Sequence, residues 1–255
     1  MRGEHTIEEQ VEQLKKYLGC PCTYYPASGN SNVLLSDFAQ ARARGKKEGF
    51  VPMLVAVDEL LLESLSFSYE GKSPEQARQE LLDFPLEPGE ALLKKWFDEA
   101  KEGWKEYDPE FYANWDAHVI GEVAGGEGIN RFLSLCDNTG KQTIPVALVE
   151  IPVKNPWEVF AWLPFGGWNE CPAPEEHMAV AKYWFEKFGA VPALMTPDVL
   201  EYTLPFDTSV PSWQALYLAK EQYAYCSDIV DQGVETIGRL ADGLAKSHYW
   251  YFWWD

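Results

Sequence analysis

YWYFWWD, residues Tyr249–Asp255, is the stretch that decides the fold, because six successive aromatic side chains cannot all face water at low cost. In a β-strand, successive side chains point to opposite faces. The aromatic side chains at positions 249, 251 and 253 would then share one face of the strand, and those at positions 250, 252 and 254 would share the other. This pattern predicts a strand covered on both sides. Many chains end in a few loose polar residues. We expect the end of this chain to dock in the core instead.

The charge balance of the chain restricts its partners. Among 255 residues there are 21 Lys and Arg against 40 Asp and Glu, a formal net charge of −19. Phosphate backbones and anionic membrane surfaces are bound by clustered cations, so we expect neither nucleic acid nor a membrane as a partner. The acidic excess agrees with two interpretations: it keeps the protein soluble, or it forms a docking surface for a cationic partner.

The cysteines and the start of the chain bear on its compartment. Five cysteines are too few and too scattered for a disulfide framework. The first residues, Met1–His5, lead into a charged helix and lack the apolar core of a signal peptide. No stretch approaches the ~18 uninterrupted apolar residues of a membrane span. We expect a soluble, cytoplasmic protein with reduced thiols.

Apolar periodicity predicts an α+β protein. Thr6 with Glu9 and Ser73 with Gln76 have the spacing of capping boxes at helix starts. Helices are expected at 6–18, 36–47, 90–107, 175–188, 212–226 and 234–245, with another beginning after Ser73. The helix at 90–107 is amphipathic, and its inward side is expected to carry Leu93, Trp96, Phe97, Ala100, Trp104 and Tyr107. Strands are expected at 50–57, 143–153, 159–163, 191–195, 200–204 and 249–254, and loops at 20–32 and 107–130.

A weak internal repeat relates two parts of the chain. At an offset of 140 residues, nine of the 25 positions in 36–60 are identical to those in 176–200, Pro52 and Pro192 among them. With small gaps the two copies extend to about 36–82 and 176–226. Two copies are too few for a solenoid. They fit two similar lobes, each a small mixed sheet with packed helices, or one domain with a pseudo-twofold.

The chain would divide near residues 152–156, where proline and charge accumulate. This boundary gives an N-terminal α+β lobe of residues 1–150 and a C-terminal α+β domain of residues 151–255.

Three motifs in order carry a resemblance to a known family. They are Pro156–Pro172 (PWEVFAWLPFGGWNECP), Tyr225–Gly233 (YCSDIVDQG) and the aromatic run at 250–255. Together they resemble the bacterial DUF4253 family over about residues 150–255. The resemblance implies a bacterial origin and a C-terminal domain of this family. It implies no activity, because the family has no known function.

The polar residues of these motifs form the first candidate site: Asn169, Glu170, Asp228, Asp231 and Gln232. In one interpretation the carboxylates converge and bind a hard cation or basic side chains. In the other, Asn169 and Glu170 cap the following helix or fix a tight turn, Asp228 caps a short helix, and Asp231 is simply exposed. The spacing is not that of an EF-hand.

Cysteine chemistry offers two weaker candidates. Cys171 with His177 or His248 could form a nucleophile and base, although the acidic neighbours would raise the pKa of the thiol. Cys20 and Cys22 could supply two zinc ligands, but a structural site needs four. We expect no metal and no other cofactor.

The tryptophans near the first motif form the last candidate. Trp157, Trp162 and Trp168 could line an aromatic pocket for a small ligand, or pack in the core. No nucleotide-binding, zinc-protease or serine-hydrolase fingerprint is present. The leading hypothesis is therefore a non-enzymatic, acidic protein that binds a basic protein partner, as an immunity or regulatory factor does. The alternatives are an enzyme such as a hydrolase, using Glu170 with Asp228 or Asp231, and a binder of a small ligand.

Overall fold

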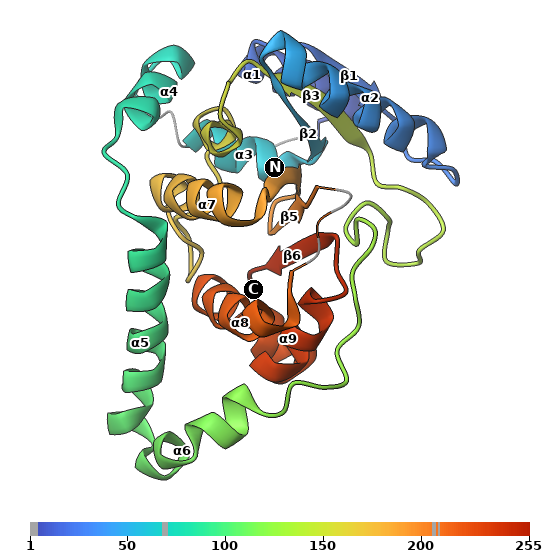
Figure 1. Ribbon diagram of the computed structural model, residues 1–255. Helices are drawn as coiled ribbons and strands as arrows, with labels where there is room; N and C mark the ends of the chain where they lie inside the picture. Colours follow the sequence, from blue (N-terminus) through green and yellow to red (C-terminus); the bar gives the residue numbers. More distant parts are fainter. Residues whose placement is uncertain (1–4, 68–70, 206–207, 209) are drawn as a thin grey trace.

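The computed structural model describes residues 5–67, 71–205, 208 and 210–255. Within them the chain forms one mixed β-sheet with helices packed against it (Figure 1). The predicted α+β class is confirmed. The predicted start of the chain and the first repeat copy include residues 1–4 and 68–70, which lie outside the described residues. Across the described part, no helix has both the length and the apolar character to cross a membrane.

Six described strands form the sheet in the order β1-β3-β2-β4-β5-β6. Their bounds are β1 Cys22–Tyr25, β2 Val51–Ala56, β3 Val146–Ile151, β4 Val191–Met195, β5 Val199–Thr203 and β6 Tyr249–Trp253. Only β2 and β4 are parallel among these neighbours, and the other pairs are antiparallel. The strands therefore alternate in direction on either side of the centre, and the central neighbours β2 and β4 run the same way.

Most of the helical residues lie in α-helices. Their bounds are α1 Ile7–Leu18, α2 Asn32–Glu48, α3 Glu59–Phe67, α4 Pro74–Asp83, α5 Gly89–Tyr107, α6 Pro109–Ala113, α7 Pro174–Phe188, α8 Ser212–Tyr225 and α9 Ile237–Leu244. Two π-helical turns, η1 Asp116–Ile120 and η3 Ile229–Val234, and one 3-10 helix, η2 Pro156–Ala161, complete them. The connection from η1 to β3 runs along one side of the molecule (Figure 1).

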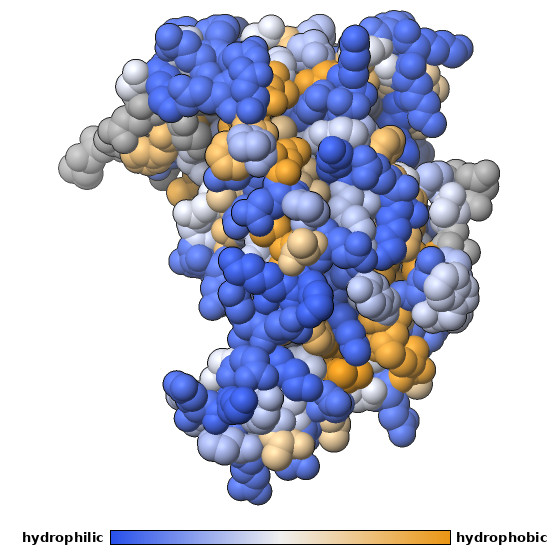
Figure 2. All heavy atoms as spheres, turned by 60° about the vertical axis from the view of Figure 1, so that its left-hand side comes forward, coloured by the Kyte–Doolittle hydropathy of each residue, from blue (hydrophilic) through white to orange (hydrophobic). Residues whose placement is uncertain are grey.

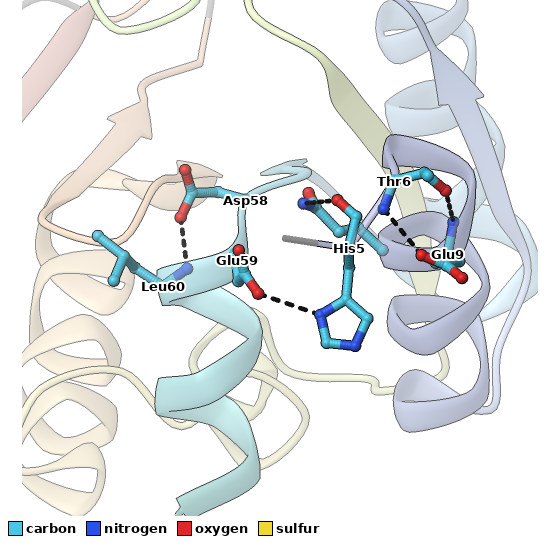
Figure 3. A network of polar contacts seen from close by, with 7 residues as sticks. His5, Thr6, Glu9, Asp58, Glu59 and Leu60 are labelled. Carbon is cyan, nitrogen blue, oxygen red and sulfur yellow. Dashed lines mark hydrogen bonds and ion pairs between the residues drawn. The ribbon is translucent and has the colours of Figure 1, made fainter. Parts of the chain in front are cut away.

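Local sequence signals set the helix starts. The backbone N–H of Thr6 donates to Glu9 at 2.8 Å, and that of Glu9 donates to Thr6 Oγ1 at 3.3 Å (Figure 3). A second capping box begins α4 at Ser73. Both predicted boxes are confirmed. Next to the first box, His5 bonds to Glu59 at 3.0 Å, so the start of α1 is held against the start of α3 (Figure 3).

The sheet separates two apolar clusters. The smaller cluster contains Phe38 of α2 and Leu54 and Leu194 of the sheet. The larger contains residues of α1, α3, α7, α8 and α9, together with Val55 and Met195. Successive strand residues contribute to opposite clusters, as the pleat requires. Helix α2 therefore covers one face, and most other helices cover the opposite face.

The strands of both predicted lobes join in this single sheet. Leu54 pairs with Leu194 and Val55 with Met195, the same offset of 140 residues as in the sequence repeat. The expectation of a small sheet in each lobe is therefore replaced by one six-stranded sheet. Because α2 and α7 pack on opposite faces, a simple shift along the sheet does not relate the two helix–strand units. Internal duplication stays a prediction.

The aromatic end of the chain forms β6, at an edge of the sheet. Trp250 and Phe252 are buried, as predicted, and both pack on Trp184 of α7 with ring centroids 5.4 Å apart. The opposite side of β6 is less covered than expected, because Tyr251 and Trp253 stay half-buried. The aromatic run thus docks one full face in the core and leaves the other partly open.

Three local predictions were wrong. The strand predicted at 159–163 is absent: residues 159–161 end the 3-10 helix η2, which begins at Pro156, and residues 162 and 163 lie in a turn and a bend. Asn155 and Glu158 form a capping box at the start of η2 that the apolar pattern did not reveal. Strand β1 lies in the segment predicted as a loop, because it pairs with β3 from far along the chain. Helix α5 was expected to bury its apolar side as far as Tyr107, whose side chain is 84% exposed.

Glu201 fastens the long connection before β3 to the sheet. Its side chain is fully buried in β5 and accepts hydrogen bonds from the backbone N–H groups of Leu133 (3.0 Å) and Ser134 (2.8 Å). The Ser134 hydroxyl donates a third, at 2.6 Å. Burial raises the pKa of Glu201, and the three donors partly oppose that rise. The three donors satisfy the hydrogen-bonding capacity of the buried carboxylate and so stabilise its position in β5.

We predict that Glu201→Gln destabilises the fold by about 1–3 kcal/mol, because one acceptor oxygen becomes an NH₂ group that faces an N–H donor. Urea denaturation at pH 7 measures the change. Glu186→Gln is the control, because Glu186 is an exposed glutamate on α7. A Glu201→Gln midpoint within error of the control would contradict this account.

Candidate functional site

A pocket of about 600 Å³ opens where α5, the turn at 168–172, the end of α8 and the end of the chain meet. Helix α5 runs beside α7 and α8 and closes one side of it (Figure 1). The lining residues are Trp96, Glu99, Ala100, Trp104, Asn169, Glu170, Cys171, Pro172, Glu176, Tyr223, Ala224, Tyr225, Ser227, Asp228, Asp231 and Trp254. We call this space the acidic pocket.

The structure brings four of the five predicted polar residues together. Asn169, Glu170, Asp228 and Asp231 all line the acidic pocket. Gln232 is not a lining residue, but its side chain donates to Asp228 Oδ1 at 2.9 Å. The turns that carry these residues are separated by more than fifty positions in the sequence, and the sheet and α8 place them side by side.

The last residue of the chain joins the two turns. Asn169 Nδ2 donates to the carbonyl oxygen of Asp255 at 2.6 Å, and the N–H of Asp255 donates to Asp228 Oδ2 at 3.1 Å. Asn169 has a φ of 48°, in the left-handed region that asparagine tolerates better than most residues. Asp228 precedes η3 but makes no capping bond to it. Its carboxylate thus holds the chain end, which the alternative of a helix cap did not foresee.

Three carboxylates of the pocket have neither a hydrogen bond nor an ion pair with any described residue. They are the side chains of Glu99, Glu170 and Asp231. No lysine or arginine lines the pocket. Loss of hydration raises the pKa of Asp231, and the negative charges of Asp228 and Glu170 raise it further. The pocket therefore holds uncompensated negative charge.

Aromatic rings form the remaining walls. Trp96 and Trp104 of α5 are half-buried, and Tyr223 of α8 is buried. Trp254 is 3% exposed, and its indole N–H has no partner among the described residues. The periodicity of residues 90–107 places Trp96 and Trp104 on the apolar side of α5 but does not link them to the polar motifs. Only the packing of α5 on α7 and α8 reveals that connection.

The three tryptophans of the predicted aromatic pocket lie elsewhere. Trp157 packs on Phe185, Trp162 lies under the Arg78 guanidinium, and Trp168 packs edge-on against Phe165. None of these three tryptophans lines the acidic pocket. Each is half-buried beside α4 or α7 or within the first motif, where it has a packing partner of its own.

Behind the pocket wall lies a buried chain of three polar side chains. Cys171 Sγ is 3.5 Å from His177 Nε2, and His177 Nδ1 is 2.5 Å from the Tyr225 hydroxyl. Burial lowers the pKa of His177 to about 3 and raises that of Cys171 above its usual value. The pair predicted as nucleophile and base is thus adjacent, with both members in their neutral forms.

The tautomer of His177 argues against this pair as a nucleophile and base. The carbonyl of Pro172 bonds to the imidazole, so we assign the proton to Nε2. Nδ1 then accepts from the Tyr225 hydroxyl. A protonated Nε2 has no lone pair with which to deprotonate Cys171. The arrangement instead satisfies the buried imidazole on both nitrogens.

Gly166 shows how tightly the first motif wraps around this histidine. Its φ is +90°, and an added Cβ would lie 1.9 Å from the Pro172 oxygen and 2.6 Å from His177 Nε2. Only glycine fits both the backbone conformation and the space. The sequence Gly166–Pro172 therefore forms a close turn over the imidazole, and this turn presents Asn169 and Glu170 to the pocket.

No metal site accompanies these groups in the part of the chain that the structure describes. Its histidine, cysteine and acidic side chains form no cluster of three or more that could hold a metal ion. Cys20 and Cys22 are free thiols, and burial raises the pKa of Cys20 to about 12.

Comparison with known families addresses the C-terminal region. Residues 147–255 match the family described as Domain of unknown function (DUF4253). The predicted resemblance is confirmed. The matched region runs from β3 to β6 and includes both turns of the acidic pocket, whereas α5 lies before it. No curated protein and no solved structure matches the chain.

His177 makes a pH-dependent contribution to stability. Because its folded-state pKa of about 3 lies below the unfolded value, the unfolded chain takes up a proton between about pH 6.5 and 3 and the folded chain does not. Stability from this group is complete above pH 6.5 and falls as the pH drops, by about 1.4 kcal/mol per pH unit.

We predict that His177→Gln is less stable than the native chain at pH 7 and that this difference narrows by pH 4.5. Urea denaturation of both proteins at the two pH values measures it. A difference in unfolding free energy that stays constant from pH 7 to pH 4.5 would show that the imidazole is not held neutral.

Proposed function

We propose that this chain binds a basic protein partner and that the acidic pocket receives a lysine or arginine side chain of that partner. The observation that carries the proposal is the combination of unpaired carboxylates and aromatic rings around one concave space with no basic lining residue. A guanidinium or ammonium group is the ligand that both kinds of wall favour.

The carboxylates support a cationic ligand through their own energetics. Burial raises the pKa of Asp231, and the negative charges of Asp228 and Glu170 raise it further, so the three carboxylates repel one another. A bound cation relieves that repulsion and forms charge-assisted hydrogen bonds with Glu99 or Glu170, which have no ionic partners among the described residues. The free energy of binding thus comes from charges that are already in place.

The aromatic walls favour an organic cation over a metal ion. Trp96, Trp104 and Tyr223 line the pocket, and cation–π contacts are strongest with tryptophan. A volume of about 600 Å³ also suits a long side chain better than a single ion. These walls support a lysine or arginine side chain as the ligand.

The surroundings of the pocket support a macromolecular partner. From Glu80 to Asp116 the chain has eleven acids and four bases, and α5 lies within this segment. The side of the molecule that α5 occupies is largely hydrophilic (Figure 2). A net charge of −19 would steer a basic protein toward this side and accelerate its association.

An enzyme is the second candidate, and the raised pKa of Asp231 favours it. A carboxyl group with a raised pKa suits general acid–base chemistry, and Glu170 and Asp228 line the same pocket. A hydrolase would need this group to contact its substrate in the pocket. Under this hypothesis Asp231→Asn abolishes turnover of a substrate, whereas under the binding proposal it weakens affinity only.

We predict that a capped peptide of alternating arginine and glycine binds the native chain and that Glu170→Gln with Asp231→Asn weakens its affinity by about tenfold or more. Isothermal titration calorimetry at two salt concentrations measures this, and binding weakens as salt rises. The matched control is Glu186→Gln with Glu235→Gln, which removes the same charge from exposed positions. If the two double variants lost the same affinity for the peptide, net charge alone would explain the effect, and a role for the pocket would be contradicted.

A further inference from the structure

The two parallel strands at the centre of the sheet separate toward their starts. β2 pairs with β3 along its whole length, from Val51 to Ala56. Its pairing with β4 is confined to Leu54 with Leu194 and Val55 with Met195. The first halves of β2 and β4 are therefore not joined, and the sheet opens there as a gap between two central strands.

Proline explains this gap. Pro52 in β2 and Pro192 in β4 have no backbone N–H, so neither can donate a ladder hydrogen bond across the opening. The register of β4 with β5 also shifts between Pro192 and Leu194. Proline is rare inside central strands, and here the two prolines face one space.

A cavity of about 500 Å³ occupies the opening, and we call it the β2–β4 cavity. Its apolar walls include Phe50, Phe185 and the two prolines, Pro52 and Pro192. The volume lies within the range of small-molecule sites, which are mostly apolar with a few placed polar groups. This cavity shares no lining residue with the acidic pocket.

The charged residues of the β2–β4 cavity are all basic. Arg42, Lys46, Lys47 and Lys154 line it, and no carboxylate does. None of the four forms an ion pair with a residue of the described ranges. In a chain with 40 acids and 21 bases, a cavity lined by four unpaired bases is contrary to the general charge balance.

Two acids at this end of α2 are engaged by Arg44. Arg44 donates to Glu48 at 3.2 Å and to Glu150 at 3.3 Å. Neither acid lines the cavity. Salt screens the electrostatic interaction of the cavity with acids elsewhere on the molecule, because the Debye length is about 10 Å at 0.1 M ionic strength. Local positive charge therefore dominates inside the cavity.

Helix stabilisation accounts for only part of this cluster. Lys46 and Lys47 lie in the last turn of α2, where cations interact favourably with the helix dipole. Lys154 comes from the loop after β3, and Arg42 is half-buried one turn before the helix end. The Arg42 guanidinium also lies 6.0 Å from the centre of the Phe38 ring. Neither the helix dipole nor this contact accounts for the convergence of all four cations on one apolar cavity.

We propose that the β2–β4 cavity binds a small organic anion with a flat apolar body. Its anionic group would lie among Arg42, Lys46 and Lys154, and its body between Phe50 and Phe185. A carboxylate or phosphate head group satisfies the cations through charge-assisted hydrogen bonds. The apolar body covers the walls that the splayed strands leave open. This site is independent of the acidic pocket and of the function proposed for it.

Naphthalene-2-carboxylate is a suitable probe, and naphthalene-2-carboxamide is its uncharged match. We expect the carboxylate to bind about tenfold or more tightly than the carboxamide. Arg42→Gln with Lys154→Gln should weaken carboxylate binding by a similar factor, while Lys16→Gln with Lys95→Gln, at exposed positions, changes it less than about twofold. Calorimetry gives the affinities, and urea denaturation checks that each variant is folded.

Amide chemical-shift mapping on the native chain tests the location without any variant. The proposal requires shifts at Val51, Val191 and Ala193 when naphthalene-2-carboxylate is added. Equal affinity for the carboxylate and the carboxamide, shifts confined to other parts of the chain, or equal losses in the two double variants would each overturn it. Inorganic phosphate that binds as tightly as naphthalene-2-carboxylate would overturn the role of the apolar body.

Discussion

The packing of Phe252 against Trp184 and Tyr225 is the interaction on which the rest of this structure depends. The Phe252 ring stacks on Trp184 with centroids 5.4 Å apart and meets Tyr225 edge-on at 4.9 Å. These three rings come from β6, α7 and α8, so one contact fixes two helices on the edge of the sheet. Because β6 is anchored there, the chain can extend two further residues to the turns at Asn169 and Asp228. Burial of apolar rings thus determines where the carboxylates lie.

Opposite charges occupy different concave parts of one molecule. The acidic pocket lies at the end of β6 and is closed by α5, outside the region that matches the family. The β2–β4 cavity lies at the centre of the sheet, where Pro52 and Pro192 keep two strands apart. Each space combines aromatic or apolar walls with charges of one sign, a combination that favours organic ions over bulk counter-ions. The family match covers only part of either lining, since residues from the first 146 positions complete both.

The sequence predicted those features of the fold that depend on residues close together in the chain. The capping boxes at Thr6 and Ser73 gave two helix starts, and the alternation along β6 gave the division of its rings between two faces, although not that one face would stay partly open. Predictions failed where distant packing decides. Strand β1 forms because it pairs with β3, which is distant in the sequence. The exposure of Tyr107 depends on how α5 packs on α7 and α8, which the sequence of α5 alone does not show. The polar motifs indicated four lining residues of the acidic pocket, but Trp96 and Trp104 could not be assigned to it, because no sequence pattern states which helix closes a pocket.

The most direct measurement of this account is the unfolding free energy of Phe252→Ala, with Tyr251→Ala as the control on the less covered side of the same strand. Urea denaturation followed by tryptophan fluorescence gives both values. Removal of a fully buried phenylalanine ring from the centre of the aromatic cluster should cost about 3–5 kcal/mol, and Tyr251→Ala should cost clearly less. A loss below about 1 kcal/mol in Phe252→Ala, or an equal loss in the two variants, would contradict the claim that this strand holds the fold and its acidic pocket together.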